Sequence, residues 1–177
     1  KVPPGWILVG TAKTAVGTLD GQKVLVKQPD ETIFKRYRAF VGPVDLANYT
    51  VEADVRGASR RRQMPALGVT AQRYSFTIYG NDQVMKIEPW GPETTRSVTV
   101  PFEWKPDTWY HLKLRVENMP DGKVRARGKA WPTGQPEPAT WMIEKIDPLG
   151  NKKGAPGFFI DADYGAFIDN IKVTANQ

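Results

Sequence analysis

The sequence contains no cysteine and only one histidine, His111. The absence of cysteine excludes disulfide bonds, thiolate metal ligands and a cysteine nucleophile. A single histidine excludes metal sites built from several imidazoles, and no nucleophile-elbow motif accompanies it as the base of a serine triad. Glycine-rich loops that bind phosphate are also absent. We therefore interpret His111 as an exposed strand residue rather than as a catalytic base.

Long apolar runs are missing as well. No run approaches the roughly 18 residues that a membrane-spanning helix requires, and no charged and then apolar signal segment opens the chain. The sequence begins at Lys1 rather than at methionine. We expect a mature protein, or a domain taken from a longer exported protein, without a membrane span.

Charge is the next feature, because 25 Lys and Arg residues outnumber 19 Asp and Glu residues and give a net charge of +6. Arg60, Arg61 and Arg62 form one local run, in a segment that reads as a loop. An excess of this size permits nucleic acid or an acidic polymer as a partner without implying either. We interpret the arginine run as a solvated loop and do not expect nucleic-acid binding.

A hairpin pattern gives the clearest structural prediction. Trp109–Glu117 reads WYHLKLRVE, Asp121 and Gly122 supply a turn, and Lys123–Trp131 reads KVRARGKAW. Apolar and polar side chains alternate along both segments, which is typical of two antiparallel strands that bury one face. We therefore predict a β-hairpin whose apolar face lies in the core.

Short strand candidates separated by turn residues fill the rest of the chain. They are Trp6–Gly10, Lys23–Lys27, Arg38–Val41, Tyr49–Arg56, Ala66–Ala71, Tyr74–Tyr79, Gln83–Glu88, Arg96–Val100, Trp141–Ile146, Gly157–Asp161 and Gly165–Val173. No segment shows helical spacing for more than two turns. Many short strands without covering helices are typical of a sandwich. We predict an all-β fold with two antiparallel sheets, forming a single β-sandwich domain over residues 1–177.

Basic side chains dominate the polar face of the predicted hairpin. That face carries His111, Lys113, Arg115 and Glu117 on one strand and Arg125, Arg127, Lys129 and Trp131 on the other. Like charges on neighbouring strands repel each other, so the face needs either interleaved carboxylates or an anionic partner. Both interpretations remain open: a solvated sheet surface, or a binding face for an anionic ligand.

Several motifs resemble the concanavalin A-like lectin/glucanase superfamily. In that superfamily a strand of the type WYxLKLRV leads into a DG turn, as at Trp109–Val116, and a final strand ends in DNIxV, as at Asp169–Val173. The resemblance implies a jelly roll. It transfers architecture better than activity, because one fold hosts many functions.

A closer resemblance is to bacterial domains attached to quinoprotein-type (PQQ-like) β-propeller proteins. Their motifs FxGP, NYTVEADV, AQRY and WYHLKLRV recur in this order at Phe40–Pro43, Asn48–Val55, Ala71–Tyr74 and Trp109–Val116. The match covers most of the chain from about Phe34 onward. It implies an exported bacterial protein, periplasmic or extracellular, with a β-propeller domain of the parent protein as a possible partner.

Glu52 and Asp54 are the first candidates for catalysis. Retaining β-glucanases of the resembled superfamily carry ExDxE or ExDxxE on one strand, and residues i and i+2 of a strand share a face roughly 6 to 7 Å apart. Arg56 and Gly57 stand where the second glutamate is expected, so a retaining mechanism would lack its acid/base. We expect the two carboxylates to pair with neighbouring arginines instead.

Aromatic residues give a better functional signal. Sugar rings stack their C–H faces on indole and phenol, while charged and amide side chains bind the hydroxyls. Trp90, in a loop rich in proline and glycine, and Trp131, which faces outward by strand parity, are the preferred contacts. The full set of predicted ligand contacts is Trp90, Trp131, Tyr79, Arg73, Arg125, Arg127, His111 and Lys113.

Asp169 is the candidate metal ligand. Sandwiches of the resembled superfamily often tie a terminal-strand aspartate to a structural calcium ion, and Asp169 in IDNI resembles that position. Asp161 and Asp163 lie close in sequence, but no dense acidic loop of the EF-hand type exists. A structural calcium is therefore a possible cofactor, and no other cofactor is expected.

The sequence thus predicts a non-catalytic carbohydrate-binding or interaction module. If the basic hairpin face is functional, its ligand is an anionic glycan such as a uronate-bearing or sulfated polysaccharide. Two alternatives remain: a glycoside hydrolase-like enzyme that uses Glu52 and Asp54, and a structural interdomain module that binds no small ligand.

Overall fold

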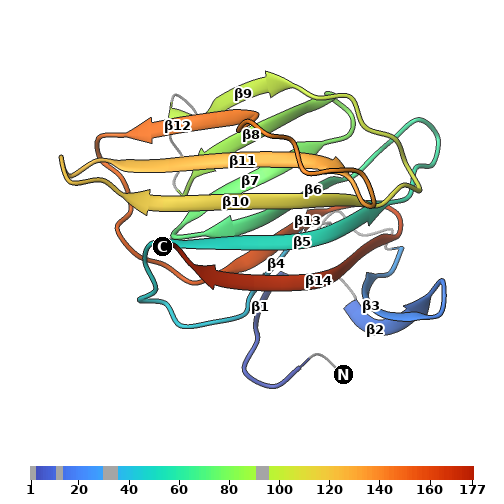
Figure 1. Cartoon of the computed structure of the whole chain (residues 1–177). Coiled ribbons are helices and arrows are strands. Elements are labelled where there is room, and N and C mark those ends of the chain that lie inside the picture. Colours follow the sequence, from blue (N-terminus) through green and yellow to red (C-terminus); the bar gives the residue numbers. More distant parts are fainter. Residues whose placement is uncertain (1–2, 11–13, 30–35, 91–95) are drawn as a thin grey trace.

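Two antiparallel sheets of seven strands each are stacked face to face in the computed structural model, which describes residues 3–10, 14–29, 36–90 and 96–177 (Figure 1). The predicted all-β sandwich is confirmed. Among the described residues, no helix is long and apolar enough to span a membrane.

The first sheet, sheet A, holds strands from both ends and from the middle of the chain. In spatial order it comprises β1 (Ile7–Gly10), β4 (Arg36–Phe40), β13 (Gly157–Asp161), β6 (Ala66–Ala71), β7 (Tyr74–Tyr79), β8 (Val84–Pro89) and β9 (Val98–Pro101). The consecutive strands β6 to β9 form a meander, and β13 returns from the far end of the sequence to pair with β6 and β4.

The second sheet, sheet B, contains the predicted hairpin. In spatial order it comprises β12 (Ile143–Asp147), β11 (Val124–Pro132), β10 (Tyr110–Asn118), β5 (Tyr49–Gly57), β14 (Ala166–Ala175), β3 (Gln22–Lys27) and β2 (Thr14–Leu19). In Figure 1 its strands β12, β11, β10, β5 and β14 run in front of sheet A. The last strand, β14, lies between β5 and β3.

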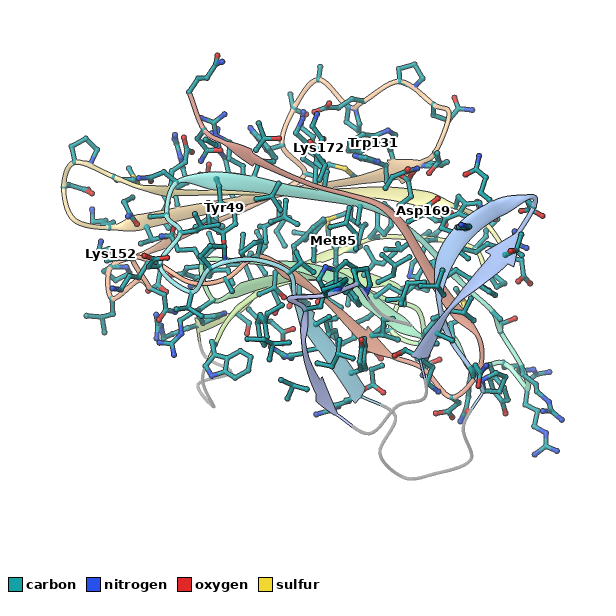
Figure 2. All side chains as sticks on the ribbon, turned by 90° about the horizontal axis from the view of Figure 1, so that it is seen from below. Tyr49, Met85, Trp131, Lys152, Asp169 and Lys172 are labelled. Atoms are coloured by element: carbon teal, nitrogen blue, oxygen red, sulfur yellow. The ribbon has the colours of Figure 1, made fainter. Side chains whose placement is uncertain are left out.

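The core lies between the sheets and follows the predicted parity. Val51 of β5, Leu112 and Leu114 of β10, and Phe76 and Ile78 of β7 are fully buried. Figure 2 shows Met85 of β8 between the two layers, with Trp131 and Lys172 on the outer side of sheet B. The alternating side chains of two strand pairs therefore define the interior, as the hairpin pattern indicated.

One strand, β2, was not predicted from the sequence. It pairs with β3 at the edge of sheet B. Its apolar signal is weak because Ala15 and Gly17 occupy two of the three positions on its less exposed face. The turn that joins the two strands is Asp20-Gly21, with φ values of 51° and 81°. Two residues with positive φ are typical of a tight hairpin turn. The dipeptide Asp20-Gly21 is therefore the sequence signal from which the β2–β3 hairpin could have been predicted.

Candidate functional site

The predicted ligand contacts divide between two opposite outer faces of the sandwich. Trp131, His111, Lys113, Arg125 and Arg127 lie on the outer face of sheet B, which we call the basic face. Trp90 and Tyr79 belong to the outer face of sheet A, and Arg73 lies in the turn between β6 and β7, where its carbonyl oxygen accepts a hydrogen bond from the Trp90 amide (2.7 Å). One small ligand therefore cannot contact both sets.

Carboxylates interleave with the cations of the basic face. Glu117 of β10 accepts hydrogen bonds from Arg115 (2.9 Å) and Arg127 (2.9 Å), and a further one from Arg125 (3.2 Å). Partial burial favours the neutral acid, but the three guanidinium groups outweigh it and hold the pKa of Glu117 below its ordinary value. The Glu117 carboxylate therefore accepts hydrogen bonds from three arginine side chains.

The segment between β11 and β12 covers another part of the basic face. Glu137 accepts hydrogen bonds from Lys113 (3.2 Å) and Lys129 (2.9 Å). The Trp141 ring lies 4.8 Å from the Arg127 guanidinium and 4.8 Å from the Lys129 ammonium. The Lys129 side chain is only 8% exposed. Of the two interpretations left open for this face, the structure therefore favours interleaved carboxylates, because they satisfy its cations internally.

His111 is not the freely exposed residue that the sequence suggested. Its Nδ1 lies 2.7 Å from Asp54 Oδ1 and its Nε2 lies 3.4 Å from Glu52 Oε1, both across the β10–β5 pair. Asn170 Nδ2 donates to Asp54 Oδ2 (2.7 Å), and the Thr133 hydroxyl donates to Oδ1 (3.4 Å). We call Glu52, Asp54, His111, Thr133 and Asn170 the His111 cluster.

Glu52 and Asp54 pair with His111 and Lys113 rather than with the arginines that we expected. Glu52 lies 3.5 Å from the Lys113 ammonium, whereas the Arg56 guanidinium contacts Asp20 (3.2 Å) on the β2–β3 turn. Burial raises the pKa of Asp54, but its hydrogen bonds to His111 and Asn170 more than compensate, so the net pKa is lowered. A carboxylate held ionised in this way is suited to orienting an imidazole and is poorly suited to general acid catalysis.

Asp169 lies directly opposite Asp54 in the β14–β5 pair, where β14 changes register. Asn170, which follows it, has a φ of 51° and turns its amide toward Asp54. Within the described ranges, no three His, Asp or Glu side chains are placed so that they could hold a metal ion. A calcium ion at Asp169 stays a prediction.

The outer face of sheet A is buried in its centre and aromatic at its margin. The outward-facing central residues are small, namely Gly68 and Thr70 of β6, Ser75 and Thr77 of β7 and Gly157 of β13. At one margin the Arg38 guanidinium lies 4.6 Å from the Trp90 ring and 5.0 Å from the Phe159 ring. At the other margin Tyr79 donates a hydrogen bond to Glu88 (2.6 Å).

A cleft of about 340 Å³ opens beside Tyr79, where the β5–β6, β7–β8 and β13–β14 connections meet. Its polar and aromatic lining includes Tyr79, Asn81, Asp82, Asp161, Asp163 and Tyr164. The Arg36 guanidinium donates to Asp161 (2.9 Å), and Arg60 lies over the Tyr164 ring at 5.3 Å. We call this the Tyr79 cleft.

Of the cleft residues, only Tyr79 is a ligand contact predicted from the sequence. Asp161 and Asp163 were considered only for calcium, and Tyr164 was not selected. The missed signal is the run DADY over residues 161–164, which places carboxylates and a phenol together directly after a buried strand. Its neighbours in the cleft come from connections that are about 80 and 100 residues earlier, and no local pattern shows that proximity.

Comparisons with known proteins support the fold. No known protein family matches the sequence, and no curated protein matches it. The carbohydrate-binding module CBM66 from Bacillus subtilis has a similar structure, with a TM-score of 0.67 at 14% identity over 97% of this chain and 96% of that chain. The VIP36 exoplasmic/lumenal domain in its calcium- and Man3GlcNAc-bound form gives 0.66 at 10% identity, over 100% and 86%.

A family 16 glycosyl hydrolase protein from Mycobacterium smegmatis also matches, with a TM-score of 0.59 at 13% identity over 97% of this chain and 93% of that chain. The chain therefore has the concanavalin A-like jelly-roll fold, as the sequence motifs implied. Carbohydrate-binding modules, lectins and glycoside hydrolases share this fold, so it does not select one activity. The association with a β-propeller stays a prediction.

Proposed function

We propose that this protein is a non-catalytic carbohydrate-binding module whose sugar site is the Tyr79 cleft. The observation that carries the proposal is the combination of two tyrosines with three aspartates around a cleft of about 340 Å³. Clefts of a few hundred Å³ are typical of small-ligand sites, and a few polar groups placed among aromatic ones orient the ligand.

The chemistry of the lining suits a sugar ring. The phenol rings of Tyr79 and Tyr164 offer faces for the C–H groups of a pyranose, and the carboxylates of Asp82 and Asp161 accept hydrogen bonds from its hydroxyls. Asp161 is held in place by Arg36, which reduces the entropy that binding must overcome. The ring that occupies this cleft is expected to be neutral, because the carboxylates repel an anion.

The basic face is a weaker candidate for the sugar site. Its arginines and lysines are already bound by Glu117, Glu137 and Glu52, so an anionic glycan would have to replace internal ion pairs. The comparisons add that a carbohydrate-binding module and a glycan-bound lumenal domain share this fold.

Glycan binding by paired variants tests the proposal. Purified protein is screened on a glycan array, and the affinity for the best neutral oligosaccharide is measured by calorimetry for wild type, Tyr164→Ala and Asp82→Ala. Each cleft variant is expected to weaken binding by at least about tenfold, because a stacking ring or a hydroxyl acceptor is lost. The control Trp131→Ala, on the opposite face, is expected to bind as wild type. Loss of binding in the control alone would move the site to the basic face.

One observation favours the alternative of an interdomain module. Strand β1 forms an edge of sheet A, and its side chains Ile7 (57%), Leu8 (41%) and Val9 (48%) are largely exposed. An exposed apolar edge strand is suited to pairing with another chain or domain. Absence of binding to any glycan, together with self-association that Val9→Lys abolishes, would support this alternative over the carbohydrate-binding module.

A further inference from the structure

We propose that Arg38 binds the carboxylate of an acidic sugar, so that the glycan recognised by this module contains uronate residues. The inference rests on the proposed carbohydrate-binding function and names the class of its ligand. It places the acidic residue on the outer face of sheet A, next to the Tyr79 cleft, and not on the basic face of sheet B.

Aromatic rings hold the Arg38 side chain in place, while its hydrogen-bond donors have no acceptor among the described residues. Its guanidinium stands over Trp90 (4.6 Å) and Phe159 (5.0 Å), and these rings orient the side chain. No described residue accepts a hydrogen bond from it or forms an ion pair with it. The planar guanidinium presents its donors in a fork that matches a carboxylate in two parallel hydrogen bonds. Two stacked aromatic contacts and an unfilled set of donors are what a carboxylate site requires.

The charge of Arg38 is also poorly compensated. Burial lowers the pKa of Arg38, and the nearby Tyr79 and Glu88 only partly oppose this effect. Glu88, whose carboxylate accepts a hydrogen bond from the Tyr79 hydroxyl (2.6 Å), acts on Arg38 through space and forms no direct ion pair with it. A half-buried cation without a paired anion is unfavourable, and a ligand carboxylate would supply that anion.

A second polar group on the same face lacks a partner. The register of sheet A places Arg38, Phe159, Gly68 and Thr77 in one row across four strands. The Thr77 hydroxyl is buried and has no hydrogen-bond partner. Buried hydroxyls are usually satisfied. Thr77 is enclosed, so its hydroxyl is not a ligand contact, and Arg38 is the accessible group of this row.

The row of Arg38 adjoins the cleft. The next row along the strands contains Arg36, Asp161, Ala66 and Tyr79, and Asp161 and Tyr79 line the Tyr79 cleft. Two residues along a strand correspond to about 6.5 Å. Across the sheet, β7 and β4 are three strand spacings of about 4.8 Å apart. A glycan with one neutral ring beside Tyr79 therefore reaches Arg38 through further rings along its chain, and not with the adjacent ring. Trp90, 47% exposed, provides a stacking surface there.

Other arginines on the described strands are occupied. Arg36 is paired with Asp161, Arg56 with Asp20, and Arg115, Arg125 and Arg127 share Glu117. An anionic ligand that bound to these residues would have to displace an internal carboxylate. Arg38 needs no such exchange, which makes it the favoured anchor for a uronate.

Matched polysaccharide pairs test the proposal. Hyaluronate, unsulfated chondroitin and gellan, in which each uronate residue has neutral neighbours, are compared with their carboxyl-reduced forms, which keep the backbone and lose the charge, by affinity electrophoresis and then calorimetry on oligosaccharides. Wild type is expected to prefer the acidic member of at least one pair. Arg38→Gln should weaken binding of that acidic form about 10- to 100-fold, the effect of one lost charge-assisted interaction, and should weaken binding of the reduced form much less.

Two further variants show whether the effect depends on the guanidinium group of Arg38 and on the position of the lost charge. Arg38→Lys keeps the charge without the fork and is expected to bind with intermediate affinity. Arg125→Gln makes the same change of net charge on the basic face and should bind the acidic form as wild type does. Melting curves confirm that each variant is folded.

The outcomes separate the two proposals. Binding of reduced or neutral glycans without any preference for the acidic forms would overturn the inference and keep the carbohydrate-binding function. A loss of acidic-glycan binding in Arg125→Gln but not in Arg38→Gln would also overturn it, because the anionic site would then lie on sheet B. Failure to bind any glycan would overturn the proposed function, and the inference with it.

Discussion

His111 and Asp54 face each other across the β10–β5 pair, with 2.7 Å between Nδ1 and Oδ1. This contact joins the hairpin to the central strand of sheet B. Asp54 also receives Asn170 from β14, so one carboxylate links three neighbouring strands of the sheet. The His111 cluster is therefore a structural element first, and its protonation is coupled to folding.

Stability should depend on the charge of His111. The hydrogen bond to Asp54 raises the pKa of His111, with partial burial opposing and Glu52 assisting. A raised pKa means that the stabilisation is complete below the unfolded-state value near 6.5 and is lost as the pH rises through the folded-state pKa. We expect the free energy of unfolding, from urea titrations between pH 6 and 9, to decline over this window.

His111→Gln is the variant that tests this coupling, because it removes the titrating group and keeps a polar side chain. The decline between pH 6 and 9 is expected to disappear in this variant and to shrink in Asp54→Asn, in which His111 keeps Glu52 as a partner. An unchanged decline in both variants would show that another group is responsible.

The His111 cluster is not expected to hydrolyse glycosides. Glu52 and Asp54 lack the second glutamate on β5, and Asp54 is held ionised by His111 and Asn170. No reducing ends should be released from β-glucans or from the glycan that the module binds. Measurable turnover that Glu52→Gln abolishes, with binding retained, would establish the glycoside hydrolase alternative instead.

Glu117 is predicted to suppress anion binding by the basic face. Glu117→Gln removes the carboxylate that Arg115, Arg125 and Arg127 share, at a cost of about 1 to 3 kcal/mol in stability because buried donors lose a charged partner. The freed guanidinium groups should also retain the variant more strongly on a heparin column. The control Asp121→Asn, in the exposed turn beside Lys123, makes the same change of net charge. Equal retention of both variants would contradict a specific role for Glu117.

Gly128 is predicted to be irreplaceable in the core. A Cβ at this position would lie 2.8 Å from two ring carbons of Phe76 and 2.9 Å from Ile143 Cγ2. Gly128→Ala should destabilise the protein by about 1 to 3 kcal/mol, the usual effect of overpacking a core. In the background Phe76→Leu, which creates space, the same substitution should cost less. Additive effects of the two changes, measured by denaturant unfolding, would place the strain elsewhere.

The alternation of apolar and polar side chains along the strands made most of the fold predictable. Alternation along Tyr49–Arg56 and Tyr110–Glu117 identified which side chains enter the core, since one face of each strand is buried. It did not give strand order. Without the β10–β5 register, the carboxylates facing His111 could not be known, so an enclosed imidazole was taken for an exposed one.

The two outer faces show the same limit for the site. The sequence pattern grouped Trp90 and Trp131 as contacts of a single ligand, yet they lie on different sheets. Loop 133–141 covers part of the basic face through Glu137 and Trp141, which a strand pattern cannot show. The Tyr79 cleft combines three distant connections, so only the folded chain brings its aspartates and tyrosines together.

The placement of β14 between β5 and β3 has a consequence for synthesis on the ribosome. Strand β5 pairs with β14 along Tyr49–Gly57, so this central strand of sheet B has a partner that lies more than 100 residues later in the sequence. Until residues 166–175 emerge, the β5 edge of a nascent chain has no partner from β14, and β3 and β2 have no sheet to join. Contacts of such long range are slow to form. Emergence of β14 from the ribosome therefore gates native closure of this sandwich, and chaperones that shield open strand edges would act before that point.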